Sequence, residues 1–139
     1  MTNYKLHLHP MWEKALSREQ KMKYAEMANS KAIQPGTLTV TEILANFKEN
    51  GGFVATILLN NGYNEPLNIQ KTAFEVADAQ GETIAKGRFE PNLDINPFSS
   101  QPWSFVFSKE MVFREGAGLA AYSVRIELEE YFIGGRKLG

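Results

Sequence analysis

The side chains best suited to chemistry in this sequence are its two histidines and a group of acids near the C-terminus. His7 and His9 stand two residues apart, so both imidazoles would lie on one face of an extended strand. A catalytic zinc site normally takes a third protein ligand, and no spacing in the sequence supplies one. We interpret these histidines as exposed residues of an edge strand, and we expect no metal and no cofactor.

The acids offer a second chemical possibility. Glu127 and Glu129 alternate along a predicted strand, with Glu130 beside them. Paired carboxylates act as acid and base only where a cleft gives them different environments, and here Arg125 shares their face. A solvated sheet surface is therefore expected. No serine stands in a nucleophile motif and the chain has no cysteine, so we predict no catalytic residue and no enzymatic activity.

The stretch "HPMWEKALSREQK", residues 9–21, has the composition of a contact surface. Trp12 is followed by the cations Lys14, Arg18 and Lys21, and protein interfaces favour Trp together with long basic side chains. We predict that these four residues bind a partner. The alternative is that Trp12 packs a helix against a sheet and the cations meet only water.

The contact stretch at residues 9–21 follows a predicted strand and leads into a predicted helix. Residues 4–9 alternate apolar and polar side chains, which predicts a short edge strand closed by Pro10. Ser17 and Gln20 have the spacing of a capping box, which predicts a helix over residues 17–28. Pro35 and Gly36 then indicate a loop.

After Gly36 the apolar residues recur with a period of two, typical of strands. The inward parity changes near Glu42, which predicts a β-bulge or a change of sheet, and Asn50-Gly51-Gly52 predicts a hairpin. Residues 90–102 are expected to form a long loop between sheets. The next strand is expected to point its aromatic side chains into the core; these are Trp103, Phe105 and Phe107.

Strands separated by turns, without helices between them, predict an all-β fold. We expect an immunoglobulin-like antiparallel β-sandwich with an N-terminal strand and α-helix appended. The chain is expected to be a single domain over residues 1–139. Within it, residues 1–36 would hold the N-terminal strand and helix, 37–131 the sandwich, and 132–139 a flexible tail.

Composition narrows the classes of partner. The formal net charge is −1 and no block of like charge occurs, so nucleic acid is not expected. No apolar run is long enough to predict a membrane span, and the first residues lack the apolar core of a signal peptide. We therefore expect a cytoplasmic protein that binds another protein. A carbohydrate or cell-wall binder, with Tyr63 and Phe98 stacking on sugars, is the alternative, favoured only outside the cell.

An ordered set of segments resembles the SLAP domain over about residues 6–115. These segments are "LHLHPMWEKALSREQKMKY", "PGTLTVTEI", "GGFVATILLNNGYNEPLNI", "TAFEVADAQGETIAKGRFE" and "QPWSFVF". The positions that carry the resemblance are Leu8, Pro10, Trp12, Lys21, Asn61, Gly62, Asp78, Gly81, Ala85, Phe89, Pro102, Trp103 and Phe105.

SLAP domains occur in S-layer assembly proteins of the accessory Sec system and in small stand-alone proteins of Gram-positive bacteria. The resemblance implies a cytoplasmic accessory factor in the export or assembly of surface-layer proteins, acting by protein contact. Its partner would be a secretion component or an exported client. No catalytic residues are assigned in the family, so the resemblance implies none in this sequence. The chain has room for one such domain, unlike the long assembly proteins.

Overall fold

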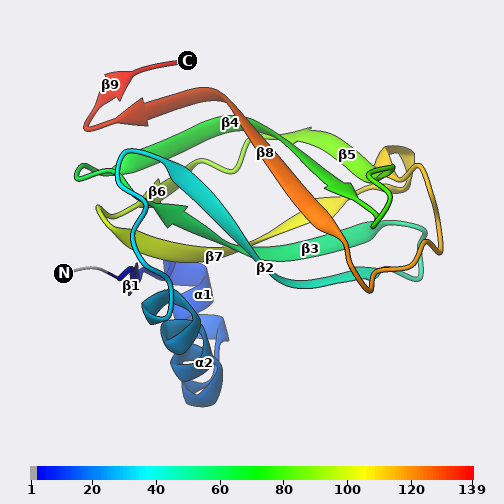
Figure 1. Ribbon diagram of the computed structural model, residues 1–139, viewed down its shortest axis with the longest axis horizontal. Helices are drawn as coiled ribbons and strands as arrows, with labels where there is room; N and C mark the ends of the chain where they lie inside the picture. Colours follow the sequence, from blue (N-terminus) through cyan, green and yellow to red (C-terminus); the bar gives the residue numbers. More distant parts are fainter. Residues whose placement is uncertain (1–2) are drawn as a thin grey trace.

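The computed structural model describes residues 3–139, and strands dominate this part of the chain (Figure 1). In chain order the elements are β1 (Lys5–Leu6), α1 (Pro10–Ala15), α2 (Arg18–Asn29), β2 (Leu38–Phe47), β3 (Phe53–Asn61), β4 (Leu67–Ala77), β5 (Thr83–Phe89), β6 (Leu93–Ile95), β7 (Ser99–Phe107), the 3-10 helix η1 (Lys109–Met111), β8 (Ser123–Ile133) and β9 (Arg136–Lys137). No helix within residues 3–139 has the length and apolar character that a membrane crossing requires.

The strands form two sheets that pack against each other. The first sheet has the order β1-β7-β3-β2, in which β1 is parallel to β7 and the other pairs are antiparallel. In the second sheet β4 pairs with β5, β6 and β8, and β9 extends β8. The predicted all-β sandwich is confirmed, while its immunoglobulin-like character stays a prediction. Figure 1 shows α1 and α2 beside the first sheet, on the side away from β4 and β8.

One apolar core lies between the sheets and takes alternate residues from each strand. On β3 the inward residues Phe53, Ala55, Ile57 and Leu59 are buried, as their period of two predicts. Phe74 of the second sheet stacks on Phe105 of the first, with ring centroids 4.3 Å apart. Such contacts between the inner faces join the two sheets.

The outer face of the first sheet is covered over only part of its length. Leu58 and Pro102, neighbours in the β3–β7 register, are buried there, and α2 packs against β1 and β7. Farther along the same face Leu44 and Val106 are 59% and 51% exposed. The helices therefore shelter one half of this face and leave the other half open.

Strand β2 confirms two sequence predictions. Its register with β3 shifts between Glu42 and Leu44, so of the two alternatives predicted there, a bulge and a change of sheet, the structure has the bulge. The turn at residues 50–52 joins β2 and β3 as an antiparallel hairpin. β2 is also the last strand of its sheet, and no residue on it is buried.

The N-terminal segment differs from its prediction. The strand expected over residues 4–9 is reduced to Lys5–Leu6, although the His7 amide still donates to the Ser100 carbonyl at 2.8 Å. Pro10, expected to close the strand, begins α1 instead. Proline suits both places, since its fixed φ and missing N–H also fit the first position of a helix, and the sequence pattern predicts no helix there. The capping box of Ser17 and Gln20 is confirmed, and α2 follows it.

Two other segments also differ from expectation. The expected loop over residues 90–102 contains β6, which pairs with β4, and the start of β7. In residues 132–139, where a flexible tail is expected, β8 continues to Ile133 and the chain returns as β9; the flexibility of this segment stays a prediction. Arg136 of β9 forms an ion pair with Glu65 at 2.9 Å, which fastens the C-terminal hairpin to the sandwich.

Candidate functional site

The predicted contact stretch folds into two short helices with defined starts. His9 caps α1 by accepting a hydrogen bond at Nδ1 from the Met11 amide, at 3.1 Å. In the capping box of α2, the Ser17 hydroxyl accepts from the Gln20 amide and the Gln20 side chain accepts from the Ser17 amide. These caps satisfy amides that a helix start leaves without partners, and each acceptor lies within three residues of its donor.

An aromatic anchor, made of His9, Trp12, Tyr24 and Trp103, fastens these helices to the sandwich. The Trp12 ring stacks on Trp103 of β7, with centroids 6.4 Å apart, and meets Tyr24 of α2 edge-on at 6.2 Å. The His9 ring lies 5.3 Å from the same Trp103. Trp103 also packs against the core cluster, although it is only half-buried, unlike Phe105 and Phe107. Trp12 therefore has a packing role.

The three predicted cations have different surroundings. Lys21 donates to a Glu13 carboxylate oxygen at 2.8 Å, which links α2 to α1. Lys14 and Arg18 are exposed, and neither forms an ion pair with any residue in the described part of the chain. The structure thus places all four predicted residues on the helical segment, and among these four only Lys14 and Arg18 are charged side chains without an ion pair in the described residues. Their binding of a partner stays a prediction.

The two histidines serve separate structural roles. His7 Nδ1 accepts a hydrogen bond from the Asn96 amide at 3.1 Å, while His9 Nδ1 caps α1. Burial lowers the pKa of His7 below its usual value of 6.5, and this effect outweighs the opposing influence of Asp94. A neutral His7 is the form that can accept the Asn96 hydrogen bond.

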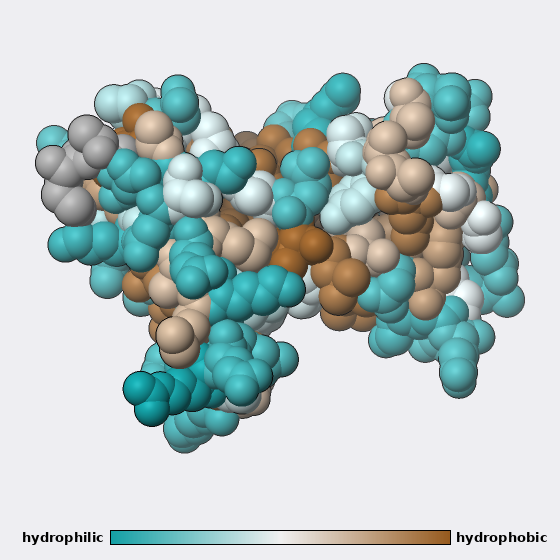
Figure 2. All heavy atoms as spheres, turned by 60° about the horizontal axis from the view of Figure 1, so that its bottom comes forward, coloured by the Kyte–Doolittle hydropathy of each residue, from teal (hydrophilic) through white to brown (hydrophobic). Residues whose placement is uncertain are grey.

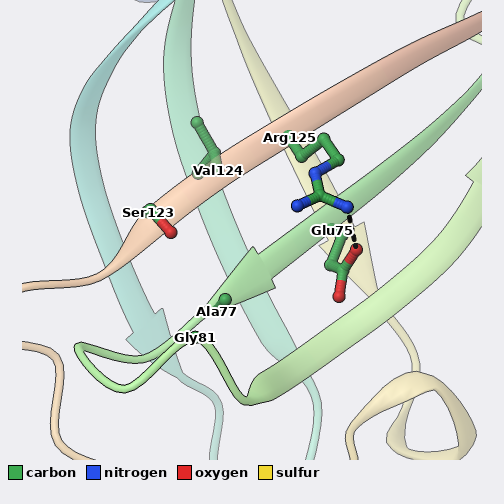
Figure 3. A pocket seen from close by; sticks show the side chains of 6 residues that line it. All are labelled: Glu75, Ala77, Gly81, Ser123, Val124 and Arg125. Atoms are coloured by element: carbon green, nitrogen blue, oxygen red, sulfur yellow. Dashed lines mark ion pairs between the residues drawn. The ribbon is translucent and has the colours of Figure 1, made fainter.

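The acidic strand face carries ion pairs that link different strands of the second sheet. Glu129 of β8 pairs with Arg88 of β5 at 3.0 Å. A shallow depression of about 150 Å³ lies beside this face, lined by Glu75, Ala77, Gly81, Ser123, Val124 and Arg125. Figure 3 shows Arg125 and Glu75 reaching toward each other from β8 and β4, with nitrogen and oxygen 3.9 Å apart. Glu75 also accepts a hydrogen bond from Thr83, so its carboxylate is engaged by neighbouring side chains.

A second feature, which lies outside the predicted contact stretch, is centred on Asn61, one of the positions that carry the SLAP resemblance. Its side-chain amide is fully buried and donates to the carbonyls of Glu65, Ile95 and Asn96, each at 3.1 Å. Its oxygen accepts from the Tyr63 amide at 2.9 Å. One side chain thereby holds the loop after β3 against the loop after β6.

The loops held by Asn61, together with the loop at Pro35 and Gly36, border an open apolar pocket. A Cβ on Gly62 would meet the Gln34 carbonyl oxygen, so only glycine permits this close approach of the preceding loop. Phe98 has a φ of 52°, an uncommon value for a bulky residue, and its amide donates to the Tyr63 carbonyl at 3.2 Å. The pocket measures about 300 Å³ and is lined by Pro35, Gly36, Gly62, Tyr63, Asn64 and Phe98.

Comparison with known proteins gives a family for this chain. No curated protein matches the sequence. The model of the SLAP domain family matches residues 6–128, which covers the aromatic anchor, the Asn61 loops and most of both sheets. The resemblance seen in the sequence is confirmed: the chain belongs to the SLAP domain family.

Proposed function

We propose that the protein is a non-enzymatic protein-interaction module that acts in the cytoplasm as an accessory factor in the export or assembly of surface-layer proteins. The observation that carries this proposal is the family match over residues 6–128. The partner would be a component of the secretion apparatus or an exported client.

The helical segment supplies a physical basis for the contact. The aromatic anchor and the Lys21–Glu13 ion pair fix the positions of α1 and α2 on the sandwich. A fixed scaffold lowers the entropy lost when a surface binds, so exposed charges on it are well placed to meet a partner. Lys14 and Arg18 are the predicted contacts that retain free charge, which favours acidic groups on the partner.

The proposal is tested by cross-linking and affinity capture with purified chain as bait, followed by reconstitution with the captured protein. The test variant is K14E/R18E, whose sites are exposed and form no ion pairs in the described structure. The control is K48E/K86E, which makes the same change in net charge at two other exposed lysines.

We expect wild type and K48E/K86E to bind the same secretion component or client, and K14E/R18E to bind it at least tenfold more weakly. Equal binding by the two double variants would refute the role of Lys14 and Arg18. Failure of wild type to bind any secretion component or surface-layer client in purified form would refute the proposed function.

The pocket at the Asn61 loops favours a second candidate, a carbohydrate or cell-wall binder. It brings Tyr63 and Phe98 together beside the side chain of Asn64, and aromatic rings with a polar group suit a sugar ring. Binding of soluble N-acetylglucosamine oligosaccharides would be measured by calorimetry. This candidate requires binding that Tyr63→Ala abolishes and that Phe113→Ala, at an aromatic 61% exposed elsewhere, leaves unchanged.

A further inference from the structure

We propose that the free edge of β2 is an acceptor for an extended segment of the protein partner, which adds to the first sheet as a further antiparallel strand. This inference rests on the proposed function: it assigns the edge of β2 as the binding surface and an extended, cation-bearing segment as the part of the partner that binds there. Strand addition uses main-chain hydrogen bonds for affinity and alternate side chains for specificity.

β2 differs from β7 and β5 in having no strand or bridge along its outer edge in the described residues, although it contacts β8 across the sandwich. The edge of β7 is taken up in part by β1. The edge of β5 is approached by the chain after η1, where Ala85 bridges Val112 and the Phe113 amide donates to the Ile84 carbonyl at 2.7 Å. Across residues 3–139, by contrast, β2 pairs with β3 on one side and with no strand on the other.

β8 also has an edge that is largely free, but its side chains protect it. β9 reaches only Phe132 and Ile133, and the rest of β8 carries charges such as Arg125 and Glu127. Charged side chains are a common device against unwanted strand pairing. β2, with the sequence "LTVTEILANF", contains no lysine and no proline and has Glu42 as its single charge. It therefore has the composition of a strand that can accept another.

Apolar side chains reach the β2 edge on both faces of the sheet. Val40 and Phe47 point inward and are only half-buried, although they pack against the core cluster. On the outer face Leu44 is 59% exposed, and Val106 two strands away is 51% exposed. Figure 2 shows apolar atoms gathered in the hollow beside the lobe that carries the helices. An added strand would bury apolar surface on either side of β2.

Glu42 defines the charge of the expected occupant. It is exposed at the bulge and forms no ion pair with a cation of the described chain. A partner segment with Lys or Arg opposite this position would gain a cross-strand charge pair. The occupant is thus an extended segment with alternating apolar residues and a central cation.

A second copy of this chain fits the edge less well. Antiparallel pairing of two β2 strands about their midpoint would place two Glu42 carboxylates near each other, and neither strand would supply a cation. Like charges directly opposite each other destabilise a strand pair. Charge therefore favours a different protein as the occupant.

The test uses a capped peptide of alternating Thr and Val with one central Lys, about nine residues long to match an ordinary strand. Its control is the same peptide with N-methyl groups on the amides of one edge, which removes main-chain donors and keeps the side chains. A third peptide has Glu in place of the central Lys. Binding is followed by titration of the backbone amide signals of the full chain, with wild type and Glu42→Lys.

We expect the Lys peptide to perturb and protect the β2 amides, and the N-methylated peptide to bind at least tenfold more weakly. Glu42→Lys should reverse the preference between the Lys and Glu peptides. Binding that N-methylation does not weaken, perturbation centred on β8 or β1, or a peptide-independent dimer through β2 would each overturn the proposal.

These outcomes are separate from those of the proposed function. If the purified secretion component or client still binds the chain while the Lys peptide leaves β2 unperturbed, the edge proposal is wrong and the interaction role stands. If the peptide binds β2 but no such partner binds, the edge is an acceptor and the export role is wrong.

Discussion

Replacing Trp12 with alanine should destabilise the protein, because Trp12 joins the helices to the sandwich through Trp103. A buried aromatic side chain removes about 150–250 Å² from water, so half-burial of Trp12 corresponds to roughly 100 Å². At about 25 cal/mol per Å² this gives roughly 2.5 kcal/mol. Loss of the stacked pair adds about 0.5–1.5 kcal/mol, so the expected loss of unfolding free energy is about 3–4 kcal/mol.

The measurement is urea unfolding followed by far-UV circular dichroism, which does not depend on the removed indole. The neighbouring Met11 is 70% exposed, so Met11→Ala is the matched control and should cost less than about 0.5 kcal/mol. A double-mutant cycle with Trp103→Ala should show a coupling of about 0.5–1.5 kcal/mol. If Trp12→Ala costs no more than Met11→Ala and the coupling is zero, the anchor assignment is refuted.

Three other changes test separate parts of the fold. Gln101 is buried, and neither its side-chain Nε2 nor its Oε1 has a hydrogen-bond partner in the described residues. Gln101→Met should therefore raise the free energy of unfolding, measured by urea denaturation, by about 1–3 kcal/mol. A decrease would mean that the side-chain amide is hydrogen-bonded. Because the lowered pKa of His7 makes the folded state bind fewer protons than the unfolded state, stability should fall as pH drops below 6.5. In an NMR titration Asp94→Asn should lower the His7 pKa further, and an unchanged pKa would contradict the stated influence of Asp94. Gly62→Ala should lower the free energy of unfolding by about 3 kcal/mol or more, because the new Cβ would meet the Gln34 carbonyl oxygen. Gly36→Ala, at a position in open space with a φ of 71°, should lower it by only about 1–2 kcal/mol. Equal losses for the two variants in thermal melts would refute the close approach at Gly62.

Features set by short-range rules were predictable from the sequence. The capping box at Ser17 and the hairpin at Asn50 each depend on residues within one turn of chain, so their chemistry is visible in the letters. The change of parity near Glu42 was also visible in the sequence, but it fits a bulge and a change of sheet equally, and the pairing with β3 decides for the bulge. The prediction that Pro10 only ends a strand was wrong, because proline is suited to the end of a strand and to the start of a helix. The tertiary structure decides between these two roles.

The candidate site was predictable only in part. Sequence composition selected Trp12, Lys14, Arg18 and Lys21 together, because Trp and cations near a helix are typical of contact surfaces. It could not assign Lys21 to Glu13, which lies in the other helix. The buried amide of Asn61 was missed for the same reason, since its partners come from loops that are distant in the sequence.

By itself the sequence determined the strand periodicity, the hairpin, the helix start and the family, because each is encoded in neighbouring residues or in an ordered set of segments. The tertiary structure decided that Trp103 meets Trp12, that Asn61 holds two loops together and that β2 is left without a neighbour. Those outcomes depend on which distant segments pack side by side, and packing between sheets and helices is a property of the whole chain.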